Sequence, residues 1–186
     1  MRRRAAIHEA GHAIVTAALG LGTVHALRIG PEGGETLSRW HAADLTQDEV
    51  HRHCIAHLGG RAAELLLLGD ASGGAGGASE ADLARATGLL LASELSLGLG
   101  DQGHLSIGAP PEPRLILSLP PATRARIQRR LDRVMEDAQE ILCQHHALLE
   151  DLARSLANTG FMGEEELARR LASLDRQSAD PAVAAL

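Results

Sequence analysis

Residues 8 to 12 read His8-Glu9-Ala10-Gly11-His12, the pattern H-E-x-x-H, and both flanks are apolar and rich in helix formers. On a helix, the two histidines lie one turn apart on the same face, where their ring nitrogens can bind one tetrahedral Zn²⁺. Glu9 lies about 100° around the helix from His8, beside such an ion. There it can act as general base on a zinc-bound water, whose pKa the ion lowers to roughly 7. The stretch predicts a core helix with the zinc site of a metallopeptidase, one zinc per chain; the alternative is a core helix whose histidines bond to backbone groups.

A catalytic zinc site also needs a third protein ligand and an open position. The metzincin extension of the motif requires glycine and histidine where this chain has Val15 and Ala18, so the third ligand comes from elsewhere. Spacing alone does not choose among the candidates, which are Glu64, Asp70, Glu80, Asp82 and the cluster His51, His53 and His57. The spacing of His53 and His57 also fits a second metal site. The simpler alternative is that they are ordinary core or surface histidines.

The composition fits one compact domain, with 186 residues of which 45% are hydrophobic. The formal net charge is −6 and there is no lysine, so we expect no nucleic-acid partner. Two cysteines, Cys54 and Cys143, fit a reducing compartment and predict a cytoplasmic protein. The longest aliphatic run, Leu65 to Leu68, is far short of the roughly 20 residues of a membrane span. The sequence contains no Walker motif, so we expect no ATP site in this chain.

The periodicity along the chain predicts a mainly α fold with a small β hairpin or edge sheet near residues 24–40. An edge strand in that region can hold an extended peptide by strand addition, and the residues expected to do so are Leu27, Ile29, Gly33 and Gly34. Helices are expected from Thr46 to Leu68, from Asp82 to about Leu97, and from Glu164 to Leu174. Apolar residues recur in steps of four and three from residue 121 to 156, which predicts one long amphipathic helix.

The order of motifs resembles the peptidase domain of the FtsH-type ATP-dependent zinc proteases. The motifs are HEAGH, LGGRAAE at Leu58 to Glu64, a glycine-rich loop, DLARAT at Asp82 to Thr87 and LGLG at Leu97 to Gly100. The likeness covers nearly the whole chain. It implies a single zincin-like peptidase domain over residues 1–176, with a zinc-binding catalytic core over 1–100, a C-terminal helical hairpin over 121–174 and a frayed tail over 177–186.

The resemblance also implies roles for two carboxylates. In that family the aspartate that opens the D-L-x-x-A-T helix is the third zinc ligand, which is Asp82 here, and Glu64 sits beside the metal as a supporting group. The alternatives are a helix-capping carboxylate spaced from Ser79 for Asp82, and a salt bridge with Arg61 or another buried arginine for Glu64. The sequence departs from the family before Asp82, where Gly76 to Ala81 replaces Thr-Thr-Gly-Ala-Ser-Asn.

The sequence thus predicts a zinc metalloendopeptidase that hydrolyses unfolded or extended polypeptides, with Glu9 as general base. The alternative is a peptidase-like module that is inactive alone, binding peptides or depending on a partner AAA ATPase, in trans or in a longer fusion. FtsH-type proteases carry membrane anchors and an ATPase ahead of the peptidase, and only seven residues precede His8 here. The resemblance also implies a hexameric homo-oligomer and a place at the cytoplasmic face of the membrane through a partner.

Overall fold

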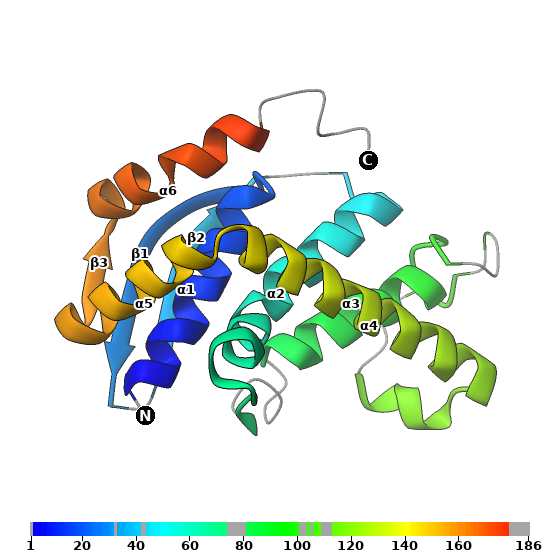
Figure 1. Ribbon diagram of the computed structural model, residues 1–186. Helices are drawn as coiled ribbons and strands as arrows, with labels where there is room; N and C mark the ends of the chain where they lie inside the picture. The colour runs from blue at the N-terminus through cyan, green and yellow to red at the C-terminus, as the bar shows by residue number, and fades with distance from the viewer. Residues whose placement is uncertain are drawn as a thin grey trace. The chain divides into compact units, whose positions relative to one another are not determined.

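The computed structural model describes residues 2–31, 33–41, 44–73, 81–100, 104, 106–108 and 113–178 (Figure 1). These residues form six α-helices, one 3-10 helix and one three-stranded antiparallel sheet. The predicted fold class, mainly α with a small hairpin near residues 24–40, is confirmed. No helix in this described part of the chain combines the length and the apolar character needed to cross a bilayer.

The chain divides into two compact units. The first contains Met1–Ala42, Gly59–Ser72 and Ala138–Leu186, and the second contains Ala43–Leu58 and Gly73–Asp137. The division falls inside two helices, α2 (Gln47–Leu68) and α4 (Pro121–Gln144). The domain limits expected from the sequence stay a prediction, and residues 179–186 of the expected tail lie outside the described residues.

The sheet belongs to the first unit and has the order β2-β1-β3. Strands β1 (Gly22–Gly30) and β2 (Gly33–Trp40) form the predicted hairpin, in which Leu27 lies opposite Thr36 and Ile29 opposite Gly34. The third strand, β3 (Phe161–Gly163), pairs with the other side of β1. A strand of only three residues is too short to show alternation, so no pattern in the sequence predicts it.

The third strand corrects one prediction. Because β1 has a partner on each side, Leu27 and Ile29 lie on the central strand and not on an edge. Leu27 is fully buried, and the backbone N–H of Ile29 donates to the carbonyl of Gly160 at 2.9 Å. Gly33 and Gly34 do lie on an edge strand, which is β2.

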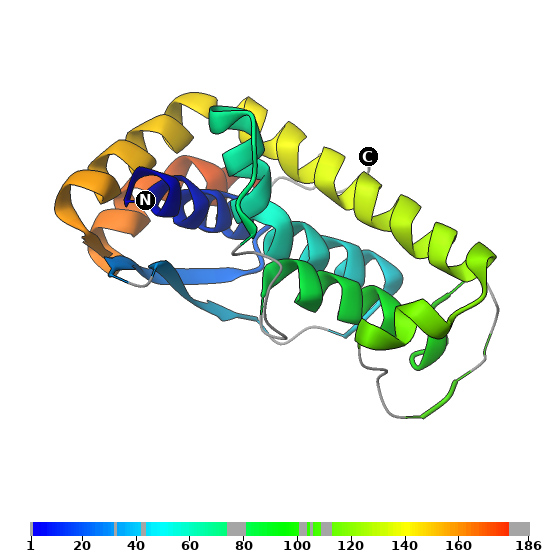
Figure 2. The same ribbon diagram turned by 90° about the horizontal axis from the view of Figure 1, so that it is seen from below.

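Helix α1 (Arg2–Ala18) is the core of the first unit. It contacts β1 and β2 and also the two C-terminal helices, α5 (His146–Thr159) and α6 (Glu164–Ser178), as Figures 1 and 2 show. Alternation places one face of β1 against this helix, and the apolar faces of α5 and α6 complete the core. The largest fully buried side chains of the first unit are Ile7, Ile14, Leu27, Leu142, Leu149, Leu152, Leu156 and Met162. A helix covered on so many sides is fixed in position, which suits it to carry a functional site.

The predicted continuous helix from residue 121 to 156 is wrong, because the chain breaks at His145. That residue has φ −113° and ψ 27°, and it separates α4 from α5. The buried apolar positions on either side of this break include Ala138, Leu142, Leu149, Leu152 and Leu156. Their steps of four, seven, three and four also fit one continuous helix, so the spacing does not reveal the break. The last helix, α6, continues to Ser178, past its expected end at Leu174.

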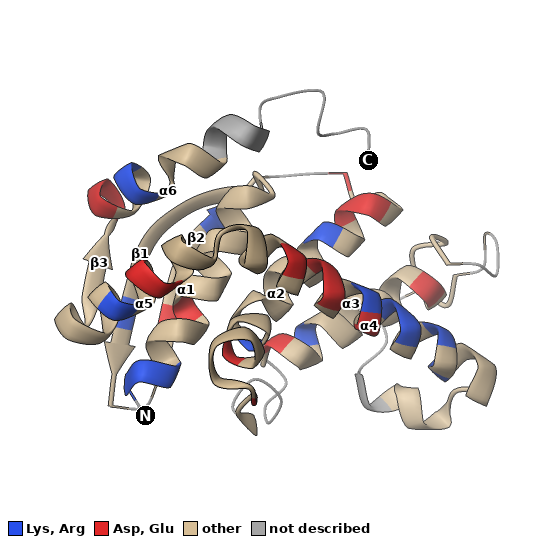
Figure 3. Cartoon of the chain, in the orientation of Figure 1, with Lys and Arg blue, Asp and Glu red and all other residues tan. Residues whose placement is uncertain are grey.

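The second unit contains the first part of α2, helix α3 (Asp82–Leu95), the 3-10 helix η2 (Pro113–Ser118) and most of α4. The start of α2 is capped by Thr46, whose hydroxyl accepts the backbone N–H of Glu49 at 3.2 Å. Arg126 on α4 pairs with Glu94 on α3, whose side chain is 2% exposed. Figure 3 shows that basic residues lie mainly in the first half of α4 and acidic ones in the second half.

Candidate metal centre

His8 and His12 lie on the same face of α1, as their spacing predicts. Their Nε2 atoms are 3.1 Å apart, and the ring centroids are separated by 4.8 Å with the planes at 72°. Both side chains are partly exposed in a helix whose other residues from Ala6 to Ala17 are buried. The helix therefore presents two ring nitrogens together toward accessible space.

The ring of His8 is oriented by a carboxylate. Its Nδ1 lies 2.8 Å from Oε1 of Glu64. An ionised carboxylate only accepts hydrogen bonds, so Nδ1 carries the proton and, in the neutral ring, Nε2 carries the lone pair. The nitrogen that faces His12 is thus the one able to bind a metal.

This donor pair fits a zinc ion. Two nitrogens that each lie about 2.0–2.1 Å from one Zn²⁺ must be within about 4.2 Å of each other, and a tetrahedral angle places them roughly 3.4 Å apart. The observed 3.1 Å satisfies this condition. Neutral imidazole is a ligand that zinc favours, and a carboxylate on the far ring nitrogen is the usual support for such a ligand.

Glycines on α1 and α2 let the two helices pack closely and leave space beside the histidine rings. A Cβ atom at Gly60 would lie 2.5 Å from Nε2 of His8 and 2.6 Å from Nε2 of His12. A Cβ at Gly11 would lie 2.4 Å from the carbonyl oxygen of Gly59 and 2.6 Å from Cβ of Ala63. Helix α1 and the Gly59–Leu68 part of α2 therefore meet backbone to backbone, and any side chain at Gly60 would occupy the metal-binding side of the rings.

Glu64 is buried, with a side chain 1% exposed, and it has several donors besides His8. Nη1 of Arg4 lies 2.6 Å from Oε2, the backbone N–H of Ser72 donates to the same oxygen at 2.8 Å, and Arg4 also pairs with Asp70 at 2.6 Å. Burial acts to raise the pKa of Glu64, but the hydrogen bonds from Arg4, Ser72 and His8 outweigh it, so the pKa lies below its ordinary value. Glu64 thus forms an arginine salt bridge, with Arg4 and not Arg61, and also orients the ring of His8. Asp70, another candidate ligand, is engaged by Arg4.

Glu9 is 5% exposed and faces β2. Its Oε2 accepts a hydrogen bond from the hydroxyl of Thr36 at 2.6 Å. A Cβ at Gly34 would lie 2.5 Å from Cγ of Glu9. The carboxylate next to the histidine pair is therefore held between its own helix and the edge strand.

Asp82 is the first residue of α3, in the second unit. The N-cap of α3 is Ala81, which makes no side-chain capping hydrogen bond. Ser79, on which the capping alternative depends, and Glu80, another candidate ligand, lie outside the described residues. The assignment of Asp82 as third ligand stays a prediction.

His51 and His53 each lie beside a carboxylate of the second unit. Nε2 of His51 lies 2.7 Å from Asp137, and Nε2 of His53 lies 3.7 Å from Glu49. Burial lowers the pKa of His53, with Arg52 acting in the same direction and Glu49 opposing both. Within the described ranges, no group of three metal-ligating side chains includes His51, His53 or His57. The structure therefore gives no support to a second metal site there.

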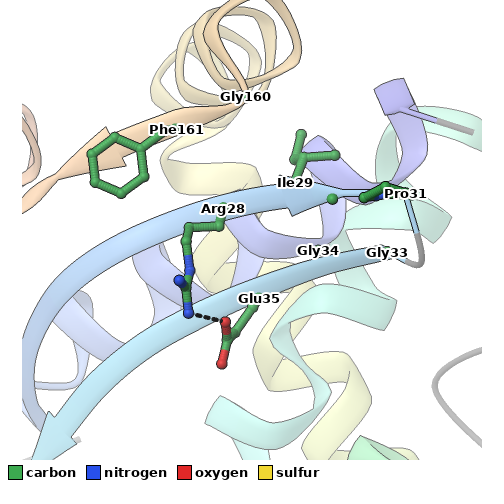
Figure 4. Close-up of a pocket in the computed structure, with 9 residues that line it drawn as sticks. Arg28, Ile29, Pro31, Gly33, Gly34, Glu35, Gly160 and Phe161 are labelled. Atoms are coloured by element: carbon green, nitrogen blue, oxygen red, sulfur yellow. Dashed lines mark hydrogen bonds and ion pairs between the residues drawn. The ribbon is translucent and has the colours of Figure 1, made fainter.

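A cavity of about 680 Å³ lies at the tip of the hairpin (Figure 4). Three of the four residues expected to bind substrate line it, and so do Arg28 and Glu35, which form an ion pair with each other. Phe161, the only phenylalanine of the chain, is 54% exposed beside it. The lining residues are Arg28, Ile29, Gly30, Pro31, Gly33, Gly34, Glu35, Gly160 and Phe161.

Three contributors to the site were not identified from the sequence. Arg4 lies one helical turn before His8, so the spacing of four was a usable signal for it. Gly60 lies inside the quoted LGGRAAE motif, where a glycine in mid-helix signals close packing. Thr36 had no such signal, because its contact with Glu9 depends on where β2 meets α1.

Comparison with known proteins identifies similar chains. Residues 1–169 match the family model of Peptidase family M41. The chain is 31% identical over 195 residues to the ATP-dependent zinc metalloprotease FtsH 1 of Methylacidiphilum infernorum, covering 95% of this chain and 30% of that protein. It is 34% identical over 194 residues to the ATP-dependent zinc metalloprotease FtsH of Methylibium petroleiphilum, covering 93% and 31%. The chain thus spans less than a third of the length of these curated relatives.

Proposed function

Because this chain belongs to Peptidase family M41 and is an FtsH-type peptidase domain, we propose that it is a zinc endopeptidase that hydrolyses unfolded or extended polypeptides. The observation that carries the proposal is the pair of His8 and His12 nitrogens, 3.1 Å apart, with Glu64 on the far side of one ring. The packing of the helix alone does not require this arrangement. In a peptidase family, the pair of histidines has a chemical role, which is to bind the metal.

His8 and His12 would hold the zinc, with Asp82 as the third ligand. The family resemblance supports Asp82, and so does the chemistry of the set, since one carboxylate after two neutral imidazoles leaves the metal a net positive charge. When bound, the zinc supplies Lewis-acid polarisation and lowers the pKa of water. Glu64 keeps the proton of His8 on Nδ1, which leaves Nε2 available as a ligand.

Glu9 is the proposed general base. It takes a proton from the attacking water and later gives that proton to the leaving amine, so its carboxylate is regenerated in each turnover. Its low exposure of 5% limits competition from bulk water and strengthens its interaction with nearby charges. The chain contains no tyrosine, so further donors to the developing oxyanion are histidine, arginine or backbone N–H groups.

The substrate would lie along β2. This strand pairs with β1 on one side, and none of the described strands pairs with its other side. Gly34 and Thr36 on this strand contact Glu9, so a peptide added at the free side would run close to the proposed base. Strand addition reads main-chain groups and needs an extended segment, which suits an unfolded polypeptide as substrate.

Delivery of such substrates is proposed to depend on a partner AAA ATPase. The relatives are named ATP-dependent, and the aligned region is about 30% of their length. A hexameric homo-oligomer is proposed on the same resemblance. Both cysteines are free, in agreement with a reducing compartment such as the cytoplasm.

A direct test is cleavage of fluorescein-labelled casein by the isolated chain. Activity should disappear after treatment with a chelator and return when one equivalent of zinc is added. Cleavage that persists after the metal has been removed would contradict the proposal. Zinc binding without any cleavage, converted to cleavage by addition of a cognate ATPase, would instead support the dependent module.

A further inference from the structure

Thr36 is the only described side chain that donates a hydrogen bond to the carboxylate of Glu9. We propose that Thr36 is a positioning residue for Glu9: its hydroxyl fixes Oε2, so that Oε1 is directed to the attacking water. The inference rests on the proposed function, because it assigns Thr36 a part in the action of the general base.

The hydroxyl of Thr36 has one proton and two acceptors within reach. It lies 2.6 Å from Oε2 of Glu9 and 3.2 Å from the backbone carbonyl oxygen of the same residue. A carboxylate oxygen at 2.6 Å takes the proton in preference to a carbonyl at 3.2 Å, since hydrogen bonds to an ionised acceptor are shorter and stronger. The bond is therefore made to the carboxylate, and it restrains rotation of that group.

The two oxygens of Glu9 are in different situations. Oε2 has the Thr36 donor, whereas no hydrogen bond to Oε1 occurs within the described part of the chain. Oε1 lies on the side of Gly34, where a Cβ would approach it to 2.6 Å. One oxygen is thus anchored, and the other is kept available by the absence of a side chain at Gly34.

Thr36 and Gly34 occupy alternate positions of β2, so both face the helix that carries Glu9. The strand anchors the carboxylate with one residue and makes room for it with the other. Since β2 is also the proposed substrate strand, the same element holds both the base and the peptide that it acts on. Strand addition uses main-chain groups, whereas the side chain of Thr36 faces Glu9, so Thr36 would affect the rate of the chemical step and not the binding of the peptide.

The test compares three variants of the full chain. Thr36→Val removes the hydroxyl with little change in volume, Thr36→Ser retains the hydroxyl, and Thr23→Val makes the same change at an exposed position of β1. On fluorescein-labelled casein, Thr36→Val should lower kcat by about 10- to 100-fold, because a buried charged group loses its donor. Its KM and zinc content should stay close to those of Thr23→Val, and Thr36→Ser should restore most of kcat.

A crystal structure of the Thr36→Val variant gives a readout that is independent of turnover. The Glu9 carboxylate should occupy more than one rotamer in the variant and a single one in the wild type. The proposal is overturned if Glu9 keeps its wild-type rotamer, if kcat changes by less than about twofold, or if the loss appears in KM or zinc content.

Failure of this inference can be separated from failure of the proposed function. If the wild-type protein cleaves casein only with zinc and Thr36→Val does so equally well, only the role of Thr36 is refuted. If wild-type cleavage does not depend on zinc, the proposed function fails regardless of the variant.

Discussion

Replacement of Gly60 by alanine tests whether the space in front of the two histidines is a metal site. The new Cβ would lie 2.5 Å from Nε2 of His8 and 2.6 Å from Nε2 of His12, whereas ordinary van der Waals contact begins at 3.4 Å. The His8 nitrogen would have to move by about 0.9 Å and the His12 nitrogen by about 0.8 Å. Displacements of this size disrupt a coordination geometry that tolerates about 0.2 Å.

The effect on zinc binding should be larger than the effect on folding. Loss of a supporting residue alone costs 10- to 100-fold in metal affinity, so displacement of two ligands should cost at least about 100-fold. Overpacking costs about 1–3 kcal/mol, and alanine regains roughly 1 kcal/mol over glycine inside a helix. The unfolding free energy should therefore fall by no more than about 2 kcal/mol.

The matched control is Gly59→Ala, one residue earlier in α2. Its Cβ would lie 3.0 Å from the carbonyl oxygen of Gly11 and 3.2 Å from Cγ2 of Val15, so the neighbours need to yield only a few tenths of an ångström. Competitive zinc titration against a chromophoric chelator, with urea unfolding of the metal-free proteins, measures both quantities. Wild-type zinc affinity in a folded Gly60→Ala variant would refute the reasoning.

Three further outcomes are expected. Glu64→Gln should weaken zinc binding about tenfold. In the metal-free protein the same change should lower the unfolding free energy at neutral pH, and this difference should shrink as the pH falls through the depressed pKa of Glu64. A difference in urea unfolding that does not change with pH would contradict this. Burial raises the pKa of Cys54 to about 12, partly offset by Arg130, so a thiol-reactive dye should label exposed Cys143 alone in the folded protein and both cysteines in denaturant. Arg126→Ala should lower the unfolding free energy by about 3 kcal/mol, since it leaves Glu94 buried without its ion-pair partner, and a loss below about 1 kcal/mol would count against that pairing.

The parts of the fold that follow from local patterning were predictable. The motif helix, the hairpin and the helix capped by Thr46 each have a periodicity or a cap that lies within a few residues. The break at His145 and the strand β3 have no such local signal. Both depend on how the C-terminal helices return to pack on α1 and β1, which is a property of the tertiary structure.

The candidate site shows the same limit. His8, Glu9 and His12 are adjacent in sequence, and helical geometry alone places the histidine nitrogens together. The partners of these residues lie far along the chain, Thr36 on β2 and Glu64 on α2, and only packing brings them to Glu9 and His8. Glu64 was expected beside the metal through family resemblance, whereas no local pattern indicated Thr36.

The most direct test of the account is to measure zinc content and casein cleavage on the same samples of wild-type protein and the Glu9→Gln variant. Glutamine has nearly the same shape but cannot accept a proton from water at neutral pH. We expect one zinc per chain in both proteins and a loss of cleavage of at least about a thousandfold in the variant. Retained cleavage by a zinc-loaded Glu9→Gln variant would contradict the assignment of Glu9 as the general base, and with it the central claim.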